Sequence, residues 1–136
     1  MMFRVLPFLL LIASAQVQAY ELPIEVIEYL DNRKVVAFIN EGDIDKTQHW
    51  APFDAAPPLT IEAALKAIKQ HVAADPEYAK ASLIGIELKQ IPHHEGYWHY
   101  LVKMKTPTTD KPRSHYFIVL MNGKVISGIR EPETVK

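Results

Sequence analysis

Two segments near the C-terminus alternate between apolar and polar side chains in the way that β-strands do. Residues 97–104 (YWHYLVKM) alternate strongly, and residues 114–121 (SHYFIVLM) alternate with rather apolar side chains on both faces. A period of two places successive side chains on opposite faces of a sheet. We therefore predict that these two segments pair as the middle of an antiparallel sheet.

Further strands extend this sheet on both sides. Residues 82–91 place apolar side chains at alternate positions, with charged side chains between them. At the other end, Asn122–Gly123 is a two-residue hairpin signal that precedes a last apolar stretch over residues 124–129. The pattern predicts about four antiparallel strands over residues 82–130.

The N-terminal part of the chain predicts a hairpin and one helix. Within residues 24–39, two alternating segments flank the turn-forming pair Asp31–Asn32 and together offer one apolar face that can be buried. Thr60 is a suitable N-cap for residues 61–73, where apolar side chains recur at helical spacing. The predicted fold class is α+β: an antiparallel β-sheet with one main helix packed on one face, plus an N-terminal β-hairpin. The apolar stripe of the helix comprises Ile61, Ala64, Leu65, Ile68 and Val72.

Residues 40–58 predict a long loop, because they contain Gly42, an acidic cluster and three prolines. Loops of this length are often functional. Trp50 and Phe53 lie in this loop and have two interpretations. They form an exposed platform for a ligand, or they fold back and seal the edge of the core.

The two faces of the predicted sheet follow from a simple hairpin register in which residue 99 lies opposite residue 121. One face, which the helix would cover, comprises Ile84, Ile86, Leu88, Trp98, Tyr100, Val102, Met104, Tyr116, Ile118, Leu120, Val125 and Ile129. The opposite face comprises His99, Leu101, Lys103, Lys105, His115, Phe117, Val119, Met121, Ile126 and Arg130. This second face is too apolar to be a solvated surface. Three candidates for its cover are the N-terminal hairpin, a second copy of the chain, and a ligand.

Composition adds the compartment to this picture. Residues 1–19 have the features of a secretory signal: a positive Arg4, a short apolar core and the small-residue cleavage site Val17–Ala19. The apolar run is shorter than the roughly 20 residues that a transmembrane helix needs. We therefore predict an exported chain, periplasmic or secreted, with a single domain over residues 20–136 and no membrane span after cleavage. The chain has no cysteine, which excludes disulfide chemistry and thiolate nucleophiles.

Charge is divided unevenly along the chain. Residues 20–60 hold three basic and eight acidic residues, whereas residues 97–130 hold six basic residues and one acidic residue. This asymmetry has two interpretations. The two parts complement each other within one domain, or the basic sheet faces an anionic partner.

Short phrases between residues 58 and 127 resemble those of a known family. They are PLTIEAALKA (58–67), the strand YWHYLVKM, and YFIVLMNGKVIS (116–127). This order resembles the PepSY-like small exported domains, which share a helix-on-sheet plan with cystatin-like folds. The resemblance implies an exported binding or inhibitory module associated with proteases or the cell envelope. The family offers no catalytic motif to carry over to this chain, and we predict no cofactor.

The histidines and neighbouring charged residues are the candidates for a chemical function. A zinc or copper site needs three or four converging ligands. His99 and His115 should lie several positions apart along their paired strands, and His93, His94 and Glu95 would hold a metal only weakly at the surface, so we predict no metal site. A small secreted hydrolase or nuclease is an alternative function, with Glu87, His99, His115 and Arg130 as acid, base and phosphate clamp. Stacking of nucleic acid on Phe117 is chemically feasible, but the predicted compartment disfavours it.

The sequence therefore favours a non-enzymatic binding module that contacts an envelope protein or an anionic envelope component. The predicted contact surface is the outer sheet face, and a structural homodimer through that face is a further alternative. The candidate binding residues are Leu101, Lys103, Lys105, Phe117, Val119, Met121, Arg130 and Trp50.

Overall fold

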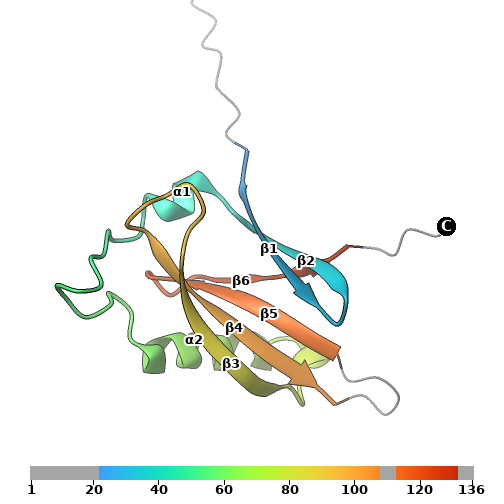
Figure 1. The fold of residues 1–136 in the computed structure, drawn as a ribbon. Helices are drawn as coiled ribbons and strands as arrows, with labels where there is room; N and C mark the ends of the chain where they lie inside the picture. The colour runs from blue at the N-terminus through green and yellow to red at the C-terminus, as the bar shows by residue number, and fades with distance from the viewer. Residues whose placement is uncertain (1–21, 108–112, 132–136) are drawn as a thin grey trace, which may run out of the picture.

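The computed structural model describes residues 22–107 and 113–131. The predicted signal segment lies outside the described residues, as do residues 108–112 between the two central strands. The described chain has the predicted α+β composition, with two antiparallel sheets and one main helix. Figure 1 shows these elements as layers, with a helix below the larger sheet and a hairpin above it.

The larger sheet confirms the predicted arrangement of the C-terminal half. Its strands are β3 (Ser82–Gln90), β4 (Trp98–Thr106), β5 (Arg113–Leu120) and β6 (Val125–Ser127), in the order β3-β4-β5-β6. The Asn122–Gly123 turn joins β5 to β6. Gly123 has a φ of 90°, which glycine adopts without steric cost, and its N–H donates to the carbonyl of Leu120 at 2.8 Å. The local turn signal in the sequence therefore predicts correctly where β5 ends and the chain turns toward β6.

The predicted hairpin is also present, as β1 (Ile24–Leu30) and β2 (Arg33–Ile39). Asp31 and Asn32 both have positive φ angles, 51° and 60°, as a type I′ turn requires. The last predicted strand differs from expectation, since it divides after Ser127. Its end forms β7 (Ile129–Arg130), which leaves the larger sheet and pairs with β2, giving a second sheet of order β1-β2-β7.

Gly128 is the residue at which the chain passes from one sheet to the other. A Cβ atom at this position would lie 2.8 Å from Cγ1 of Val35 and 2.9 Å from the ring of Tyr116. Contacts shorter than 3.0 Å force a displacement, so the crossing is tight enough to require glycine. The two sheets are therefore joined through β6 and β7 and share one packed boundary.

Helix α2 (Ile61–Ala73) matches the predicted bounds. The Thr60 side chain caps it by accepting a hydrogen bond from the N–H of Ala63 at 3.1 Å. Ala64 and Ile68 of the predicted stripe are buried, whereas Ile61 is exposed at the first turn. A short 3₁₀ helix, η1 (Pro76–Tyr78), follows. The predicted loop over 40–58 contains one further helical turn, α1 (Glu41–Ile44).

The predicted face assignment is wrong for the second central strand, because the register differs by one residue. His99 lies opposite Leu120, not residue 121, and Val102 lies opposite Phe117. A shift of one residue moves every side chain of a strand to the other face. As a result, Phe117, Val119 and Met121 pack under α2, in a core with Tyr100, Val102 and Met104. Tyr116, Ile118 and Leu120 face the other way, and Leu101 lies with them.

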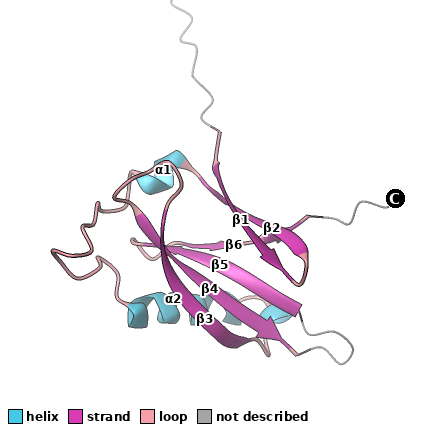
Figure 2. Cartoon of the chain, in the orientation of Figure 1, coloured by secondary structure: helices cyan, strands magenta, loops and turns pink. Residues whose placement is uncertain are grey.

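The cover of the second face is the N-terminal hairpin, the first of the three expected candidates. Val26, Leu30, Val35, Ala37 and Ile39 pack on Leu101, Tyr116, Ile118 and Leu120 to form a second core. The hydroxyl of Tyr116 donates to the carbonyl of Val26 at 2.5 Å and lies 3.2 Å from the carbonyl of Val35. Figure 2 shows the larger sheet between α2 and this hairpin. Both faces of the two central strands, β4 and β5, are therefore core.

Candidate binding surfaces

The apolar residues expected to form an exposed binding face are buried. Leu101, Phe117 and Val119 have no exposed surface, and Met121 is 5% exposed. Leu101 contacts the hairpin, whereas Phe117, Val119 and Met121 contact the layer of α2. The prediction that these four residues form an outer, accessible surface is therefore wrong, because the hairpin covers one face and the helix covers the other.

Two of the three basic candidates are engaged in contacts within the described chain. Lys103 lies 3.6 Å from the carboxylate of Glu87, and Lys105 is exposed near the end of β4. Arg130 instead contributes to an internal contact described below. Ion pairs also join the acidic N-terminal part to the basic C-terminal part, as between Asp43 and Lys124 at 2.8 Å. These pairs support the interpretation of the charge asymmetry as complementarity within the domain.

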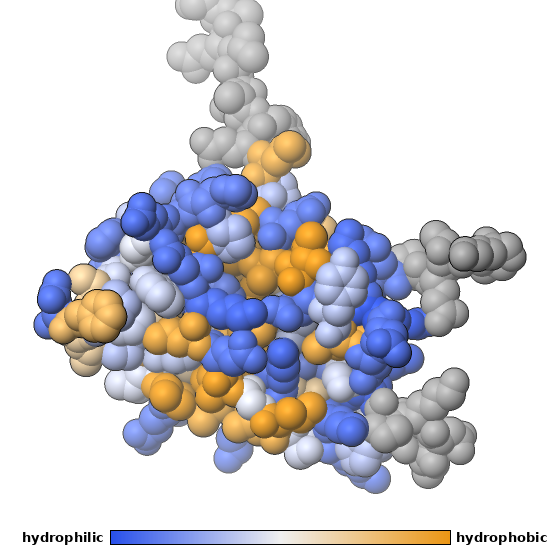
Figure 3. Space-filling view, in the orientation of Figure 1, coloured by the Kyte–Doolittle hydropathy of each residue, from blue (hydrophilic) through white to orange (hydrophobic). Residues whose placement is uncertain are grey.

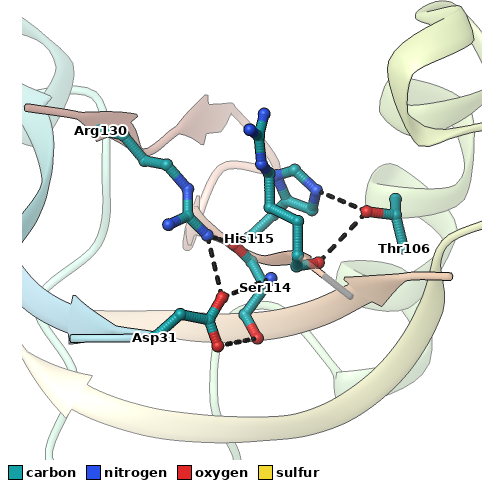
Figure 4. A network of polar contacts seen from close by, with 6 residues as sticks. Asp31, Thr106, Ser114, His115 and Arg130 are labelled. Atoms are coloured by element: carbon teal, nitrogen blue, oxygen red, sulfur yellow. Dashed lines mark hydrogen bonds and ion pairs between the residues drawn. The ribbon is translucent and has the colours of Figure 1, made fainter. Parts of the chain in front are cut away.

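Figure 4 shows how the turn of the hairpin is held on the start of β5. Asp31 accepts hydrogen bonds from the N–H of Ser114 at 2.9 Å and from its hydroxyl at 3.3 Å. Arg130 reaches both the Asp31 carboxylate, at 3.2 Å, and the Ser114 carbonyl. The Ser114 N–H is the main cause of the lowered pKa of Asp31, and Arg130 adds to it. This network positions the hairpin, so its residues have a structural role.

Thr106 and His115 form the neighbouring contact in Figure 4. The Thr106 hydroxyl lies 3.2 Å from the carbonyl of Arg113 and 3.1 Å from Nε2 of His115. Because the carbonyl can only accept, the hydroxyl donates to it and accepts from the imidazole. The His115 ring also packs edge-on against Tyr78 at 5.0 Å. A small pocket of about 260 Å³ lies beside this contact, between η1 and the ends of β4 and β5.

Trp50 adopts the second of its two expected arrangements and seals the core. It is buried, and its ring packs edge-on against Trp98 at 5.6 Å. Its indole N–H donates to the carbonyl of Ala55, and its backbone N–H donates to the carbonyl of Gly96. Only part of Trp50 lines a shallow groove of about 400 Å³ with Trp98. Phe53, in contrast, is fully exposed in the same loop.

The histidines expected to share a face do not do so. His99 faces the hairpin and is buried, whereas His115 lies opposite Met104 on the side of η1. The two positions are five residues apart along the ladder, or about 17 Å at the rise of a strand. With Glu87 exposed on β3, the expected acid, base and phosphate clamp do not converge. In the described residues, no three His, Asp or Glu side chains form a potential metal site.

Two of the histidines have informative surroundings. Nδ1 of His94 lies 2.9 Å from the Pro92 carbonyl and Nε2 lies 2.9 Å from the Glu41 carboxylate. Since both neighbours are acceptors, the protonated imidazole is favoured and the pKa of His94 is raised. Nδ1 of His99, in contrast, is buried and has no hydrogen-bond partner among the described residues. Burial lowers the pKa of His99.

The far side of the hairpin carries an exposed apolar surface that was not predicted from the sequence, and we call it the outer hairpin face. Ile27, Tyr29, Phe38 and Ile129 lie on it and are 42%, 72%, 40% and 59% exposed. The register places Ile27 opposite Val36 and Val36 opposite Ile129, so these residues lie on one face of three neighbouring strands. Val36 itself, between the other two, is 5% exposed. The sequence did contain a signal for this surface. The alternation of residues 24–39 places apolar side chains on both faces of the hairpin and not on one. In Figure 3, hydrophobic surface is visible over the region of β1.

A second exposed surface follows β3, the strand at the edge of the larger sheet. Leu83, Ile84 and Leu88 are all exposed there, and Figure 3 shows hydrophobic surface along the lower side of the molecule, where β3 lies. The register of β3 changes between Leu83 and Gly85, which marks a β-bulge. From Ile86 onward the strand is regular and carries Glu87 and Lys89 on its hairpin side.

No family of known proteins, no curated protein and no solved structure matches this chain. Among the helices of the described residues, none is both long enough and apolar enough to cross a membrane.

Proposed function

We propose that this protein is an exported, non-enzymatic binding or inhibitory module that recognises an envelope protein through its outer hairpin face. The observation that carries this proposal is the exposure of Ile27, Tyr29, Phe38 and Ile129 on one side of a small sheet. Exposed apolar patches of this kind mark interaction sites in soluble proteins. The proposed function is the one that the resemblance to PepSY-like domains implies. The proposed contact surface, however, is the outer hairpin face and not the sheet face expected from the sequence.

The make-up of the patch favours a protein as the bound partner. Tyr and other aromatic residues are enriched among the side chains that dominate protein–protein binding energies. Tyr29 is the most exposed member of the patch, and its ring offers both an apolar body and a hydroxyl. A partner with an apolar centre would bury this ring together with Phe38 and Ile27.

The charges at the border of the patch indicate what should surround that apolar centre. Glu25, Lys34 and Glu131 lie on the same side, and Lys34 pairs with Glu131 at 3.1 Å. The three groups together carry one negative charge. This balance disfavours an anionic envelope component and favours a protein that places a basic side chain near Glu25.

The test is capture of a partner from envelope extract with the purified protein, followed by reconstitution with the identified partner. A Tyr29→Ser, Phe38→Ser double variant should bind at least about 30-fold more weakly, since hot-spot truncations cost about 2 kcal/mol or more. Phe53→Ser is the matched control, because Phe53 is fully exposed but lies in the loop. It should bind like the wild type.

Two outcomes would contradict the proposal. One is a partner that the double variant retains with wild-type affinity. The other is salt-sensitive binding to vesicles of anionic lipid or to polyanions that the double variant also retains, which would restore the anionic component as the target. In both cases circular dichroism must show that the variant is folded.

A further inference from the structure

The β3 edge of the larger sheet is incompletely covered. A helix with its side chains is about 10–12 Å wide, whereas four strands spaced by about 4.8 Å span more than that. Helix α2 packs over β5 and β6, which lie toward the edge of the sheet opposite β3. As a result, Leu83 and Leu88 on the helix side of β3 remain 48% and 38% exposed. The strand offers both an apolar strip and an unpaired edge within the described chain.

Symmetry restricts how β3 can pair with a second copy of itself. Two identical antiparallel strands in one sheet are related by a two-fold axis perpendicular to that sheet, so the axis passes through a pair of identical residues. The regular part of β3, after the bulge, runs from Gly85 to Gln90. An axis at Ile86 would extend the pairing into the bulge. The remaining choices inside this stretch are Glu87, Leu88 and Lys89.

The charges on β3 select one of these registers. An axis at Glu87 or at Lys89 places like charges directly opposite each other, which is destabilising. An axis at Leu88 places Glu87 of each copy opposite Lys89 of the other, and it brings the two Leu88 side chains together. Ile86 lies on the same side as Leu88 and adds to the apolar contact. This register therefore gives two opposite-charge pairs and one apolar pair by symmetry.

We propose that the protein forms a two-fold homodimer in which β3 pairs antiparallel with β3 of a second copy, centred on Leu88. The two larger sheets then become one continuous sheet, and the two α2 helices lie on the same side of it. The outer hairpin face takes no part in this contact. Each dimer would therefore present two such faces, and a partner with two sites would bind with increased avidity.

The first measurement is the mass of the purified protein by sedimentation equilibrium between about 1 and about 100 µM, the range in which a micromolar dimer dissociates. Glu87→Lys and Lys89→Glu should each weaken the dimer at least about tenfold, since each turns two attractive pairs into two repulsive ones. An equimolar mixture of the two variants should restore it, because both pairs are again of opposite charge in the heterodimer. Lys69→Glu on α2 is the matched control, since it reverses one exposed charge away from β3.

A second variant separates the dimer contact from the ion pairs within one protomer. Lys89 also bonds Glu28 of the hairpin at 2.6 Å, so Lys89→Glu disturbs that contact as well. Leu88→Asp leaves every one of these charged groups in place and brings two carboxylates together at the axis. It should be monomeric and folded.

A wild type that stays monomeric at about 100 µM would overturn the proposal, as would a mixture of variants no more dimeric than either alone. A dimer that survives Leu88→Asp would place the interface elsewhere. The Tyr29→Ser, Phe38→Ser variant should remain dimeric, so the homodimer and the partner-binding face fail or succeed independently.

Discussion

The hydroxyl of Tyr116 should be one of the most important single polar groups for stability. It donates to the carbonyl of Val26 at 2.5 Å and lies near that of Val35, inside the core between hairpin and sheet. Tyr116→Phe removes this donor without changing the volume of the ring. A buried acceptor that loses its partner costs about 1–3 kcal/mol. We expect the free energy of unfolding to fall by that amount, because Tyr116 is only 1% exposed.

Urea denaturation followed by tryptophan fluorescence measures this change. At a slope of about 2 kcal/mol per molar urea, the midpoint should fall by roughly 0.5–1.5 M. Tyr29→Phe is the matched control, because Tyr29 is 72% exposed on the same hairpin and its loss of a hydroxyl should change stability by less than about 0.5 kcal/mol. A Tyr116→Phe variant as stable as the control would refute the reasoning that this bond holds the hairpin on the sheet.

Further predictions concern one glycine and two histidines. Gly128→Ala should destabilise the protein by roughly 1–3 kcal/mol in the same assay, because the methyl group meets buried side chains of β2 and β5. The carbonyl of Pro92, and then Glu41, raise the pKa of His94, so the stability from this contact is present below about pH 6.5 and is lost as the pH rises through the folded pKa. Glu41→Gln should therefore cost more stability near pH 5.5 than near pH 8.5. His99 has the opposite sign, because burial lowers its pKa, and its contribution is lost as the pH falls below about 6.5. An NMR titration of the imidazoles should place His94 above and His99 below that value.

The elements that the sequence predicts well are those with strong local signals. The Asp31–Asn32 turn, the Thr60 cap and the Asn122–Gly123 turn each depend on backbone angles or hydrogen bonds within a few residues. The hairpin, the helix and the strands β3, β4 and β5 consequently lie where the pattern places them. None of these signals needs knowledge of what packs on the element from elsewhere in the chain.

The features that sequence could not predict depend on contacts between distant segments. Residues 114–121 are apolar on both faces, so their alternation does not indicate which face meets the helix. The predicted register depended on an assumed turn geometry and was wrong by one residue. This error placed Phe117 and Val119 on the face that Tyr116 and Ile118 occupy, and the reverse. The move of β7 into the second sheet depends on the small volume of Gly128, which only the three-dimensional packing reveals.

The hairpin buries one apolar face of the larger sheet, but it exposes an apolar face of its own. It covers the side of the larger sheet that carries Leu101 and Tyr116, and this burial explains why both central strands can be apolar on both sides. A two-stranded cover has an outer face of its own, however, and a sheet that only had to act as a cover would carry polar residues there. At the centre of that face is Val36, with Tyr29 and Phe38 exposed near it. Shielding the core does not account for these side chains, so the outer hairpin face is where we expect selection for binding to have acted.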